Sequence, residues 1–452
     1  LAIVLLLQSL IMLIDFSVQN FSSFNSTQEL SLISSTTTKE LCDLENVHDV
    51  NKFGIKGVLQ SAAIFGSNGS GKTNFVDSLK ILKSLVLDSL DSVSDSSIKH
   101  VIPFLLKKDQ FDTPTEFEVS FIAEGNLYRY GISVVEGEIE EEWLYWNKTA
   151  RETMLFHREK QTVNYNQRSF SEAKLFVKKE GDTWSIEKTK SHVPFLSVLS
   201  QFDGERSSTV TRWFEKLNVI SGIHEAGFKR FTSELFEKDP AFKLWALEIL
   251  KSLQIEDVSI VEHEQGFPLL TPKKAIDDKE LNDVFSKLKG YFDKNTIKEK
   301  TIEIIKKTIG GEVFSLPLGL ESEGTRKLIY LLGPLYDVIK NNEILVVDEF
   351  DNKFHTLLSK FIIQLYNKHN FGESQLILTC HDTNLLTNEL FRRDQIWFVD
   401  KNDNHESELF SLVEYKEHYT RKEKSYSRDY LLGKYGAIPL FSSISELGEL
   451  LN

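Results

Sequence analysis

One short segment constrains the fold of this chain more than any other. Residues 66–73 read GSNGSGKT, which fits the pattern G-x-x-x-x-G-K-[ST]. A largely apolar run, Ser61–Phe65, comes before the segment, and apolar residues recur after it at helical spacings of three and four. Strand, glycine-rich loop and amphipathic helix in this order are typical of a loop whose backbone N–H groups surround a polyphosphate at a helix N-terminus. The segment therefore predicts a nucleotide-binding α/β fold.

The side chains of this loop have predicted roles of their own. Lys72 should reach the β- and γ-phosphates of the nucleotide, and the Thr73 hydroxyl should ligate Mg²⁺. A glycine-rich turn without function is the alternative, and the strand and helix on either side of the loop argue against it. The full set of predicted phosphate-binding residues is Gly66, Ser67, Asn68, Gly69, Ser70, Gly71, Lys72 and Thr73.

Two adjacent carboxylates end a second apolar run. Asp348 and Glu349 follow Ile344–Val347, which has the length and composition of a buried strand. Because successive side chains of a strand point to opposite faces, the two carboxylates can do different jobs. We expect Asp348 to hold Mg²⁺ and Glu349 to act as the general base on the attacking water. Without the phosphate loop, a cap on the following helix would explain the pair equally well.

A histidine comes just after a third apolar run. His381 follows Leu376–Thr379, so its imidazole should lie at a strand end, where ligand sites of α/β folds gather. A lone histidine is more often structural than functional. Here three strand ends converge on one site, which favours a role in which His381 bonds the γ-phosphate or the attacking water.

A fourth segment, Glu321–Thr325, reads ESEGT and precedes a helical pattern. Ser322 suits the N-cap position of that helix. A helix N-terminus is also a site for anions, and the residues alone do not decide between the two interpretations.

The apolar pattern divides the chain into three predicted regions. Residues 12–200 begin with a strand, contain the phosphate loop and continue with alternating runs that predict an antiparallel β subdomain. Residues 201–310 have helical spacing, also in the lysine-rich stretch Lys273–Lys307, and predict a helical insertion. Residues 311–452 alternate strands with helices, which predicts a mostly parallel sheet.

Two local features do not follow the pattern of these three regions. Gly333 and Pro334 interrupt a helical pattern, so we expect them to kink or break that helix. Leu1–Ile11 precedes Met12 and the first strand pattern, and we expect it to be an extension outside the fold.

Composition narrows the class of protein. The net charge of -14 and the pI near 5.4 argue against a surface coated in basic residues for sequence-blind nucleic-acid binding. The only cysteines, Cys42 and Cys380, cannot build a disulfide framework or a cysteine-based zinc site, which favours a reducing cytoplasm. Leu1–Leu13 is apolar but too short to span a bilayer, so no membrane association is expected. The lysine-rich stretch Lys273–Lys307 and the tail residues Arg421, Lys422, Lys424 and Arg428 are candidates for contact with nucleic acid or a phage protein. Interleaved acids such as Asp277, Asp278 and Glu280 favour a solvated helical face instead.

With these motifs in order, the chain resembles the ABC-class ATPases of the RecF, SMC and OLD group, and more closely the bacterial abortive-infection ATPases of phage defence. The resemblance implies a P-loop ATPase head, in which a mostly parallel sheet and an antiparallel β subdomain carry an inserted helical region. The segments that carry it are FSVQNFSSF from Phe16, GSNGSGKTN from Gly66, ESEGT from Glu321, VVDEFDNKFH from Val346, TCHDTNLL from Thr379 and YLLGKYGAIP from Tyr430.

The resemblance also implies an activity and an assembly. It implies a cytoplasmic ATP hydrolase with ATP and Mg²⁺ as cofactors, whose heads form a homodimer or higher homo-oligomer when ATP binds. Ser322 and Gly324 would then contact the γ-phosphate held by the loop of the partner subunit. Asp351 falls where the family has its D-loop and Gln110 is the candidate for its Q-loop glutamine. Ser22 stands where relatives often have arginine, so a nucleotide contact made by that arginine is not expected here.

The biological role implied by the resemblance is that of a sensor or transducer in antiphage defence. About seventy residues follow His381, too few for a nuclease domain, so the effector would be a separate nuclease or toxin. The alternative is a DNA-repair or chromosome-maintenance ATPase similar to RecF or SMC proteins, although the chain has no long heptad repeats. A further alternative is a scaffold that ATP switches without turnover. Nucleic acid stays open as a partner, although the net charge does not indicate it.

Overall fold

The computed structural model describes residues 11–35, 46–90, 97–108, 111–149, 151–181, 183–220, 226–265, 297–307, 311–369, 373–415 and 425–438. They form two compact units, one within Leu1–Ile223 and Asp337–Asn452 and the other within His224–Tyr336. The predicted region boundaries, after residues 200 and 310, stay predictions. Some predicted features lie outside the described residues: positions 1–10 of the extension, Cys42, Gln110, positions 273–296 of the lysine-rich stretch, Arg421, Lys422 and Lys424.

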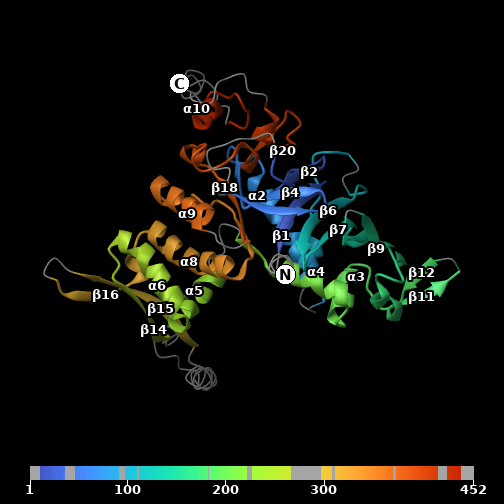
Figure 1. Ribbon diagram of the computed structural model, residues 1–452, viewed down its shortest axis with the longest axis horizontal. Coiled ribbons are helices and arrows are strands. Elements are labelled where there is room, and N and C mark those ends of the chain that lie inside the picture. The colour runs from blue at the N-terminus through green and yellow to red at the C-terminus, as the bar shows by residue number, and fades with distance from the viewer. Residues whose placement is uncertain are drawn as a thin grey trace, which may run out of the picture. The chain divides into compact units, whose positions relative to one another are not determined.

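The first unit contains a six-stranded sheet in the order β13-β17-β18-β5-β19-β20, of which Figure 1 labels β18 and β20. All neighbours are parallel except β19 and β20. The strands between the edges are almost wholly apolar, because both faces of a parallel sheet are covered. The predicted mostly parallel sheet is confirmed. Its strands are β13 (Leu217–Ile220), β17 (Ile344–Val347), β18 (Gln375–Cys380), β5 (Ser61–Phe65), β19 (Ile396–Lys401) and β20 (Ser407–Ser411).

A nine-stranded sheet also belongs to the first unit, in the order β11-β12-β10-β9-β8-β7-β6-β1-β2. Every neighbouring pair is antiparallel, which confirms the predicted antiparallel subdomain. Its strands are β1 (Met12–Gln19), β2 (Gln28–Ser31), β6 (Thr115–Ala123), β7 (Asn126–Val135), β8 (Glu138–Asn147), β9 (Glu152–Glu159), β10 (Thr162–Tyr165), β11 (Val177–Glu180) and β12 (Thr183–Ile186). A short hairpin of β3 (Val47–Lys52) and β4 (Ile55–Leu59) completes the strands of this unit.

Helix α2 (Lys72–Leu87) begins at the phosphate loop and is anchored on the antiparallel sheet. Phe75, one turn into the helix, packs edge-on against Phe16 of β1 at 5.5 Å between ring centroids and against Phe24 at 6.1 Å. Aromatic pairs of this geometry add to the stabilisation from burial. The loop is thus attached to a helix that the core holds in place. The other helices of this unit are α3 (Phe195–Gln201), α4 (Glu205–Glu215), α9 (Thr356–His369) and α10 (Tyr426–Leu431).

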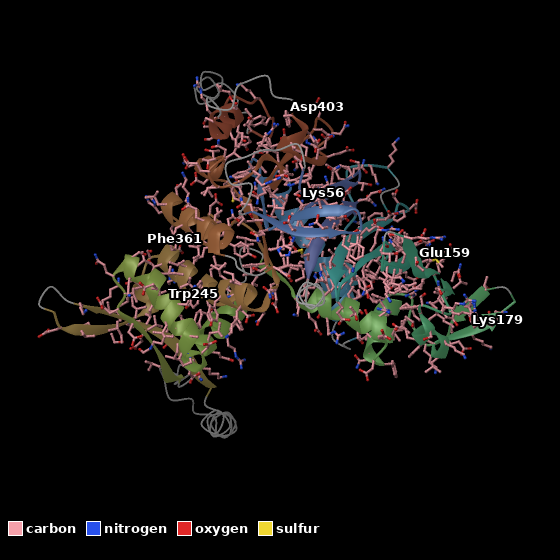
Figure 2. The ribbon with its side chains drawn as sticks, viewed as in Figure 1. Lys56, Glu159, Lys179, Trp245, Phe361 and Asp403 are labelled. Atoms are coloured by element: carbon pink, nitrogen blue, oxygen red, sulfur yellow. The ribbon has the colours of Figure 1, made fainter. Side chains whose placement is uncertain are left out.

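The second unit packs helices against a three-stranded antiparallel sheet in the order β14-β15-β16. An aromatic cluster forms part of its core: Tyr336 lies 5.2 Å from the Phe242 ring and 5.4 Å from that of Trp245, which Figure 2 labels. The elements are α5 (Ala226–Lys238), α6 (Pro240–Leu250), β14 (Asp257–Gln265), β15 (Ile297–Lys307), β16 (Val313–Pro317) and α8 (Glu323–Asn341), whose last turn belongs to the first unit.

The expectation of helix throughout Lys273–Lys307 is wrong at its C-terminal end, because β15 is a strand. Ile302 and Ile304 are 4% and 0% exposed and lie on one face of that strand, two positions apart. β-Branched residues with this period fit a half-buried strand, and pairing with β14 and β16 on both sides supplies the backbone hydrogen bonds. Tertiary pairing therefore overrides a spacing that also suited a helix.

Of the two expected effects of Gly333 and Pro334, a kink or a break, the break is wrong, because α8 continues through both. Proline has no N–H for the carbonyl four residues earlier, which here is that of Tyr330. The Thr232 hydroxyl of α5 donates to this carbonyl oxygen at 2.7 Å instead. A Cβ on residue 333 would lie 2.2 Å from the same hydroxyl, so Gly333 makes room for the compensating contact. Helix α8 can therefore include both Gly333 and Pro334, because the Thr232 hydroxyl replaces the hydrogen bond that proline cannot donate.

Candidate functional site

The phosphate loop connects the carboxyl end of β5 to α2, as the sequence pattern predicts. Gly71 is the N-cap of α2 with φ 119°, a left-handed conformation that favours glycine. At Gly66 the reason is space, because a Cβ would lie 2.4 Å from the Val399 carbonyl oxygen. No side chain of the described residues caps α2. Its first N–H groups can therefore bind an anion.

Lys72 lies across this loop and is only 4% exposed. Its Nζ donates to the carbonyl oxygens of Gly66 at 2.8 Å and Ser67 at 3.0 Å. Burial lowers the pKa of Lys72 to about 8, although the nearby Asp348, Asp351 and Glu349 favour the charged form. An ammonium group whose charge is poorly solvated gains strongly from an added anion.

Asp348 is held by two hydroxyl groups, one on each carboxylate oxygen. Thr73 donates to its Oδ2 at 2.9 Å, and Thr379 donates to its Oδ1 at 2.6 Å. Asp348 follows β17 and Thr73 follows β5, with β18 between these strands. The strand order therefore brings the loop and the first carboxylate together across the β18 residue Thr379.

Glu349 has a left-handed backbone with φ 48°, a conformation that costs energy for a residue with a Cβ. Its N–H donates to Thr379 Oγ1 at 2.7 Å, and the N–H of Phe350 donates to the Thr379 carbonyl oxygen at 3.0 Å. The Glu349 carboxylate accepts a hydrogen bond from Asn352 Nδ2 at 3.0 Å. The two adjacent acids therefore have different partners, Asp348 the two threonines and Glu349 the amide of Asn352.

His381 lies at the end of β18, where its Nδ1 is 3.5 Å from Lys72 Nζ. Partial burial and the Lys72 charge lower its pKa, which keeps the imidazole neutral near pH 7. Its backbone N–H donates to Asp351 Oδ2 at 2.8 Å, and the N–H of Asp382 donates to the same oxygen. The structure brings together five predicted site residues at one edge of the six-stranded sheet: Lys72, Thr73, Asp348, Glu349 and His381.

A family model described as "AAA domain, putative AbiEii toxin, Type IV TA system" matches residues 61–387, from the start of β5 to beyond His381. The chain belongs to this family. The match confirms the predicted relationship to abortive-infection ATP-binding proteins. No curated protein matches the chain.

Several solved structures are similar in part to this AAA-domain protein. The SMC head domain from Thermotoga maritima has 12% identity and a TM-score of 0.40, covering 88% of this chain and 98% of its own. An Smc head domain with an extended coiled coil, bound to the C-terminal domain of ScpA derived from Pyrococcus furiosus, has 14% identity and a TM-score of 0.42, covering 89% and 96%. RecF with ATP has 12% identity and a TM-score of 0.35, covering 89% and 98%. Likeness at this level says nothing about the ligands or partners of this chain.

Two predicted site residues of this AAA-domain protein lie in its other unit. Ser322 directly precedes α8, and its Oγ accepts a hydrogen bond from the Thr325 N–H at 3.2 Å, which is the bonding of an N-cap. Gly324 lies in the first turn of α8. The phosphate loop, Asp348, Glu349 and His381 belong to the first unit. The roles predicted for Ser322 and Gly324 stay predictions.

Sequence reasoning missed the contribution of Thr379 and the contacts of Asp351. A signal for Thr379 was present, since it is the one hydroxyl in the otherwise apolar β18 run Leu376–Cys380. Asp351 is 7% exposed, and its Oδ2 accepts two backbone hydrogen bonds from the end of β18. Neither contact can be read from spacing, because both depend on which strands are neighbours.

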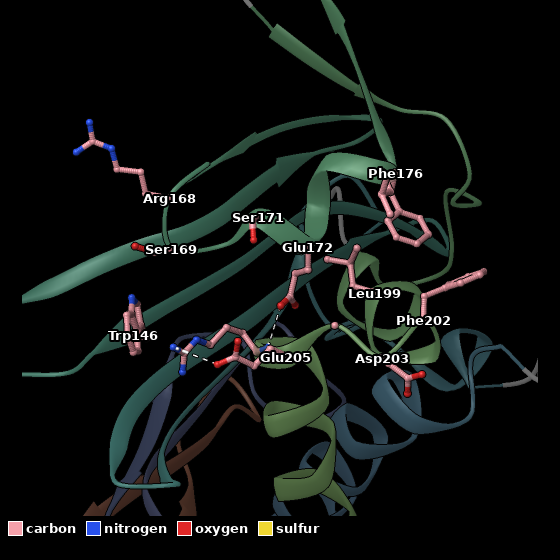
Figure 3. A pocket seen from close by; sticks show the side chains of 13 residues that line it. Trp146, Arg168, Ser169, Ser171, Glu172, Phe176, Leu199, Phe202, Asp203 and Glu205 are labelled. Carbon is pink, nitrogen blue, oxygen red and sulfur yellow. Dashed lines mark hydrogen bonds and ion pairs between the residues drawn. The ribbon is translucent and has the colours of Figure 1, made fainter.

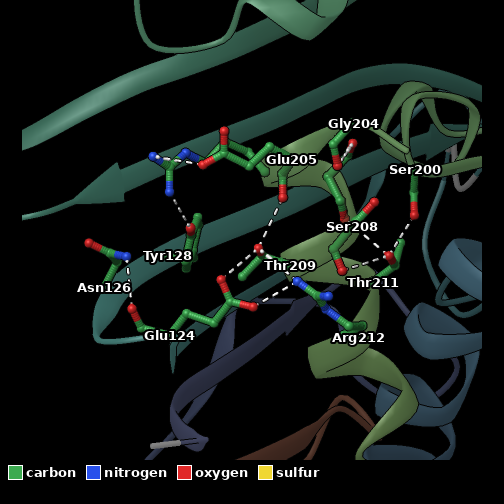
Figure 4. A network of polar contacts seen from close by, with 12 residues as sticks. Glu124, Asn126, Tyr128, Ser200, Gly204, Glu205, Ser208, Thr209, Thr211 and Arg212 are labelled. Carbon is green, nitrogen blue, oxygen red and sulfur yellow. Dashed lines mark hydrogen bonds and ion pairs between the residues drawn. The ribbon is translucent and has the colours of Figure 1, made fainter. Parts of the chain in front are cut away.

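A separate hollow of about 600 Å³ lies between the antiparallel sheet and the start of α4 (Figure 3). Glu172 accepts hydrogen bonds from the backbone N–H groups of Arg206 and Ser207, both at 2.9 Å, and so caps α4. The Arg206 guanidinium lies 4.3 Å from the Trp146 ring centroid. Further along α4, Glu124 binds Arg212 at 2.7 Å (Figure 4). These groups fix α4 to the sheet, and none of the predicted site residues lines the hollow.

None of the helices in the described ranges combines the length and apolar character that crossing a bilayer needs.

Proposed function

We propose that this AAA-domain protein is a Mg²⁺-dependent ATP hydrolase. One observation carries the proposal: the groups that phosphate transfer needs meet at neighbouring strand ends. Lys72 Nζ lies 3.5 Å from His381 Nδ1, and Thr73 Oγ1 lies 2.9 Å from Asp348 Oδ2. A cation, a hydroxyl–carboxylate pair, a further carboxylate and a neutral imidazole together can bind a polyphosphate and activate water.

The residues present fit a magnesium ion. Mg²⁺ is usually bound by one or two protein oxygens together with phosphate oxygens and water. Among the described residues there is no cluster of three or more His, Cys, Asp and Glu side chains that could hold a metal without such help. Thr73 and Asp348 would hold the ion, which when bound neutralises charge on the β- and γ-phosphates. Residue Thr73 is exposed, whereas Asp348 is only 3% exposed.

The remaining residues of the site have complementary tasks. Lys72 binds and orients the phosphates, and the loop N–H groups do the same without a side chain. Glu349 accepts the proton of the attacking water. His381, kept neutral, can donate or accept one hydrogen bond at the γ-phosphate or the water.

Phosphate release from ATP should require the metal. Wild-type protein is expected to release phosphate in millimolar Mg²⁺, to stop when EDTA is added, and to recover when Mg²⁺ is restored in excess. The reason is that one lysine alone cannot offset the negative charge of the phosphates during transfer. Phosphate release measured in these three conditions tests the proposed activity. A rate that EDTA does not change, or no release in any condition, would contradict it.

ATP affinity should fall as pH rises through about 8. In the free protein the pKa of Lys72 is lowered to about 8, and bound phosphate should raise it again. Only the charged ammonium attracts phosphate, so affinity is complete below this pKa and is lost above it. By about pH 9 the affinity should be about tenfold weaker than at about pH 7, with uptake of a proton on binding. Calorimetric titrations in buffers of different ionisation enthalpy measure both effects, and a flat profile would contradict the assignment of Lys72.

We further propose that ATP makes two heads dimerise and that Ser322 and Gly324 of one subunit complete the site of the other. The position of Ser322 and Gly324 at the start of α8 supports this, because a helix N-terminus is suited to a phosphate group. If so, the mass in solution should rise from that of one 52.0 kDa chain to twice that value when ATP is bound but not hydrolysed. A mass that ATP leaves unchanged would contradict the proposal.

For the biological role we propose a transducer in antiphage defence that acts through a separate effector. The family, described with a putative AbiEii toxin, supports defence over the RecF-like or SMC-like alternative. Bacteria carrying this chain together with its gene neighbours should survive phage challenge better than bacteria carrying the chain alone. Protection or toxicity from the chain alone would place the effector activity in the chain itself. Sensitivity to DNA damage on loss of the gene would favour the repair alternative.

A further inference from the structure

We infer that Thr379 is a positioning residue for hydrolysis, a conclusion that rests on the proposed ATPase function. Its hydroxyl aligns the Asp348 carboxylate and at the same time holds the backbone of Glu349. It connects the residue proposed to bind the metal with the residue proposed to activate water.

The contacts of the Thr379 hydroxyl use both of its hydrogen-bonding capacities. It donates to Asp348 Oδ1 at 2.6 Å and accepts from the Glu349 N–H at 2.7 Å. The side chain is 0% exposed, so water cannot replace either partner. One buried hydroxyl therefore connects the Asp348 carboxylate with the backbone of Glu349.

The first effect concerns the plane of the Asp348 carboxylate. Its other oxygen, Oδ2, accepts from the Thr73 hydroxyl at 2.9 Å, so each carboxylate oxygen has its own hydroxyl donor. With both oxygens fixed, the carboxylate cannot rotate about its terminal bond. Outer contacts of this kind orient the groups that bind a metal and strengthen its binding.

The second effect concerns the backbone at Glu349. A φ of 48° is unfavourable for glutamate and persists only where surrounding contacts enforce it. Consecutive N–H groups, those of Glu349 and Phe350, donate to the hydroxyl and carbonyl oxygens of Thr379. Thr379 thus holds the turn that aims the Glu349 side chain.

The sheet itself does not require this hydroxyl. The pairing of β18 with β17 and β5 uses backbone groups, and the other β18 residues between Leu376 and Leu378 are apolar. Valine has the shape of threonine and the same preference for strands, so it would serve the sheet equally well. The Thr379 hydroxyl is therefore needed for the candidate site and not for the sheet.

The test compares Thr379→Val with Thr379→Ser. The valine variant should keep ATP binding without metal but lose about 10- to 100-fold in kcat, and should need about 10- to 100-fold more Mg²⁺ for half-maximal activity. The serine variant, which retains the hydroxyl, should recover most of both. Wild-type kcat and Mg²⁺ dependence in Thr379→Val would overturn the inference.

Ser61→Ala is the matched control for the loss of a buried hydroxyl. Ser61 is the first residue of β5, at the opposite end of that strand from the phosphate loop, and is 1% exposed. Its hydroxyl donates a hydrogen bond to Asn367 and accepts one from Gln395. This variant should lower the melting temperature about as much as Thr379→Val but leave kcat and Mg²⁺ dependence unchanged. Equal loss of activity in both variants at equal loss of stability would reduce Thr379 to a structural role.

A readout without turnover separates this inference from the proposed function. If wild-type protein does not hydrolyse ATP, the proposed function fails. The stimulation of ATP binding by Mg²⁺ can still be measured in wild type, Thr379→Val and Thr379→Ser. A smaller stimulation in the valine variant alone supports alignment of Asp348 by Thr379, and equal stimulation in all three overturns it.

Discussion

Glu349→Gln is expected to bind ATP as wild type does and to hydrolyse it about a thousandfold more slowly. Glutamine has the shape of glutamate but cannot take a proton from water, and a positioned general base contributes about 10²- to 10⁴-fold to rate. The turn that positions residue 349 should persist, because it depends on backbone contacts to Thr379. Phosphate release and equilibrium ATP binding, measured on the same preparation, distinguish loss of chemistry from loss of binding.

Glu343→Gln is the control for this experiment. Glu343 directly precedes β17, at the opposite end of the strand from Glu349, and its carboxylate accepts a hydrogen bond from Asn218 at 2.8 Å. The Glu343→Gln protein should hydrolyse ATP at the wild-type rate. A Glu349→Gln protein that turns over at that rate would remove Glu349 as the base. The Glu349→Gln protein should also accumulate the ATP-bound dimer. Sedimentation experiments measure the mass of that dimer.

Local patterns were enough to predict the parts of the site that lie within one segment. The loop 66–73 and the pair Asp348 and Glu349 each follow a strand directly, so their positions depend on a few neighbouring residues. The parallel sheet follows from the alternation of apolar runs and helices. What the pattern could not show is that β18 lies between β17 and β5, which is why the hydroxyl of Thr379 went unrecognised.

The two errors in secondary structure have the same origin. Ile297–Lys307 suits a helix by spacing and a strand by its β-branched residues, and only the neighbours β14 and β16 decide. Pro334 would break an isolated helix, but a threonine nearly a hundred residues earlier, Thr232, satisfies the carbonyl that it leaves open. In both cases a distant segment supplies the hydrogen bonds that local propensity cannot anticipate.

Lys72→Met is expected to weaken ATP binding about a thousandfold. Two charge-assisted contacts to phosphate, each worth about 2 kcal/mol, correspond to about 4 kcal/mol or three powers of ten in Kd. Stability should change little, because methionine has a similar length and avoids burying a charge. The lysine does form hydrogen bonds to Gly66 and Ser67, but burial already lowers its pKa to about 8, so the ammonium contributes little net stability.

Lys80→Met provides the comparison, because Lys80 lies on the same helix but is exposed to solvent. Binding of a fluorescent ATP analogue and the melting temperature should be measured for both variants. Lys80→Met should match wild type in both, whereas Lys72→Met should lose binding with its melting temperature preserved. If Lys72→Met instead binds within threefold of wild type, the polyphosphate is held by the loop backbone alone. If Lys72→Met unfolds, the bonds from Lys72 to the loop carbonyls are structural. In that case Lys72→Arg, which keeps the charge and the donors, should restore the fold. It should still bind ATP poorly, because a planar guanidinium does not fit a loop that surrounds a compact ammonium.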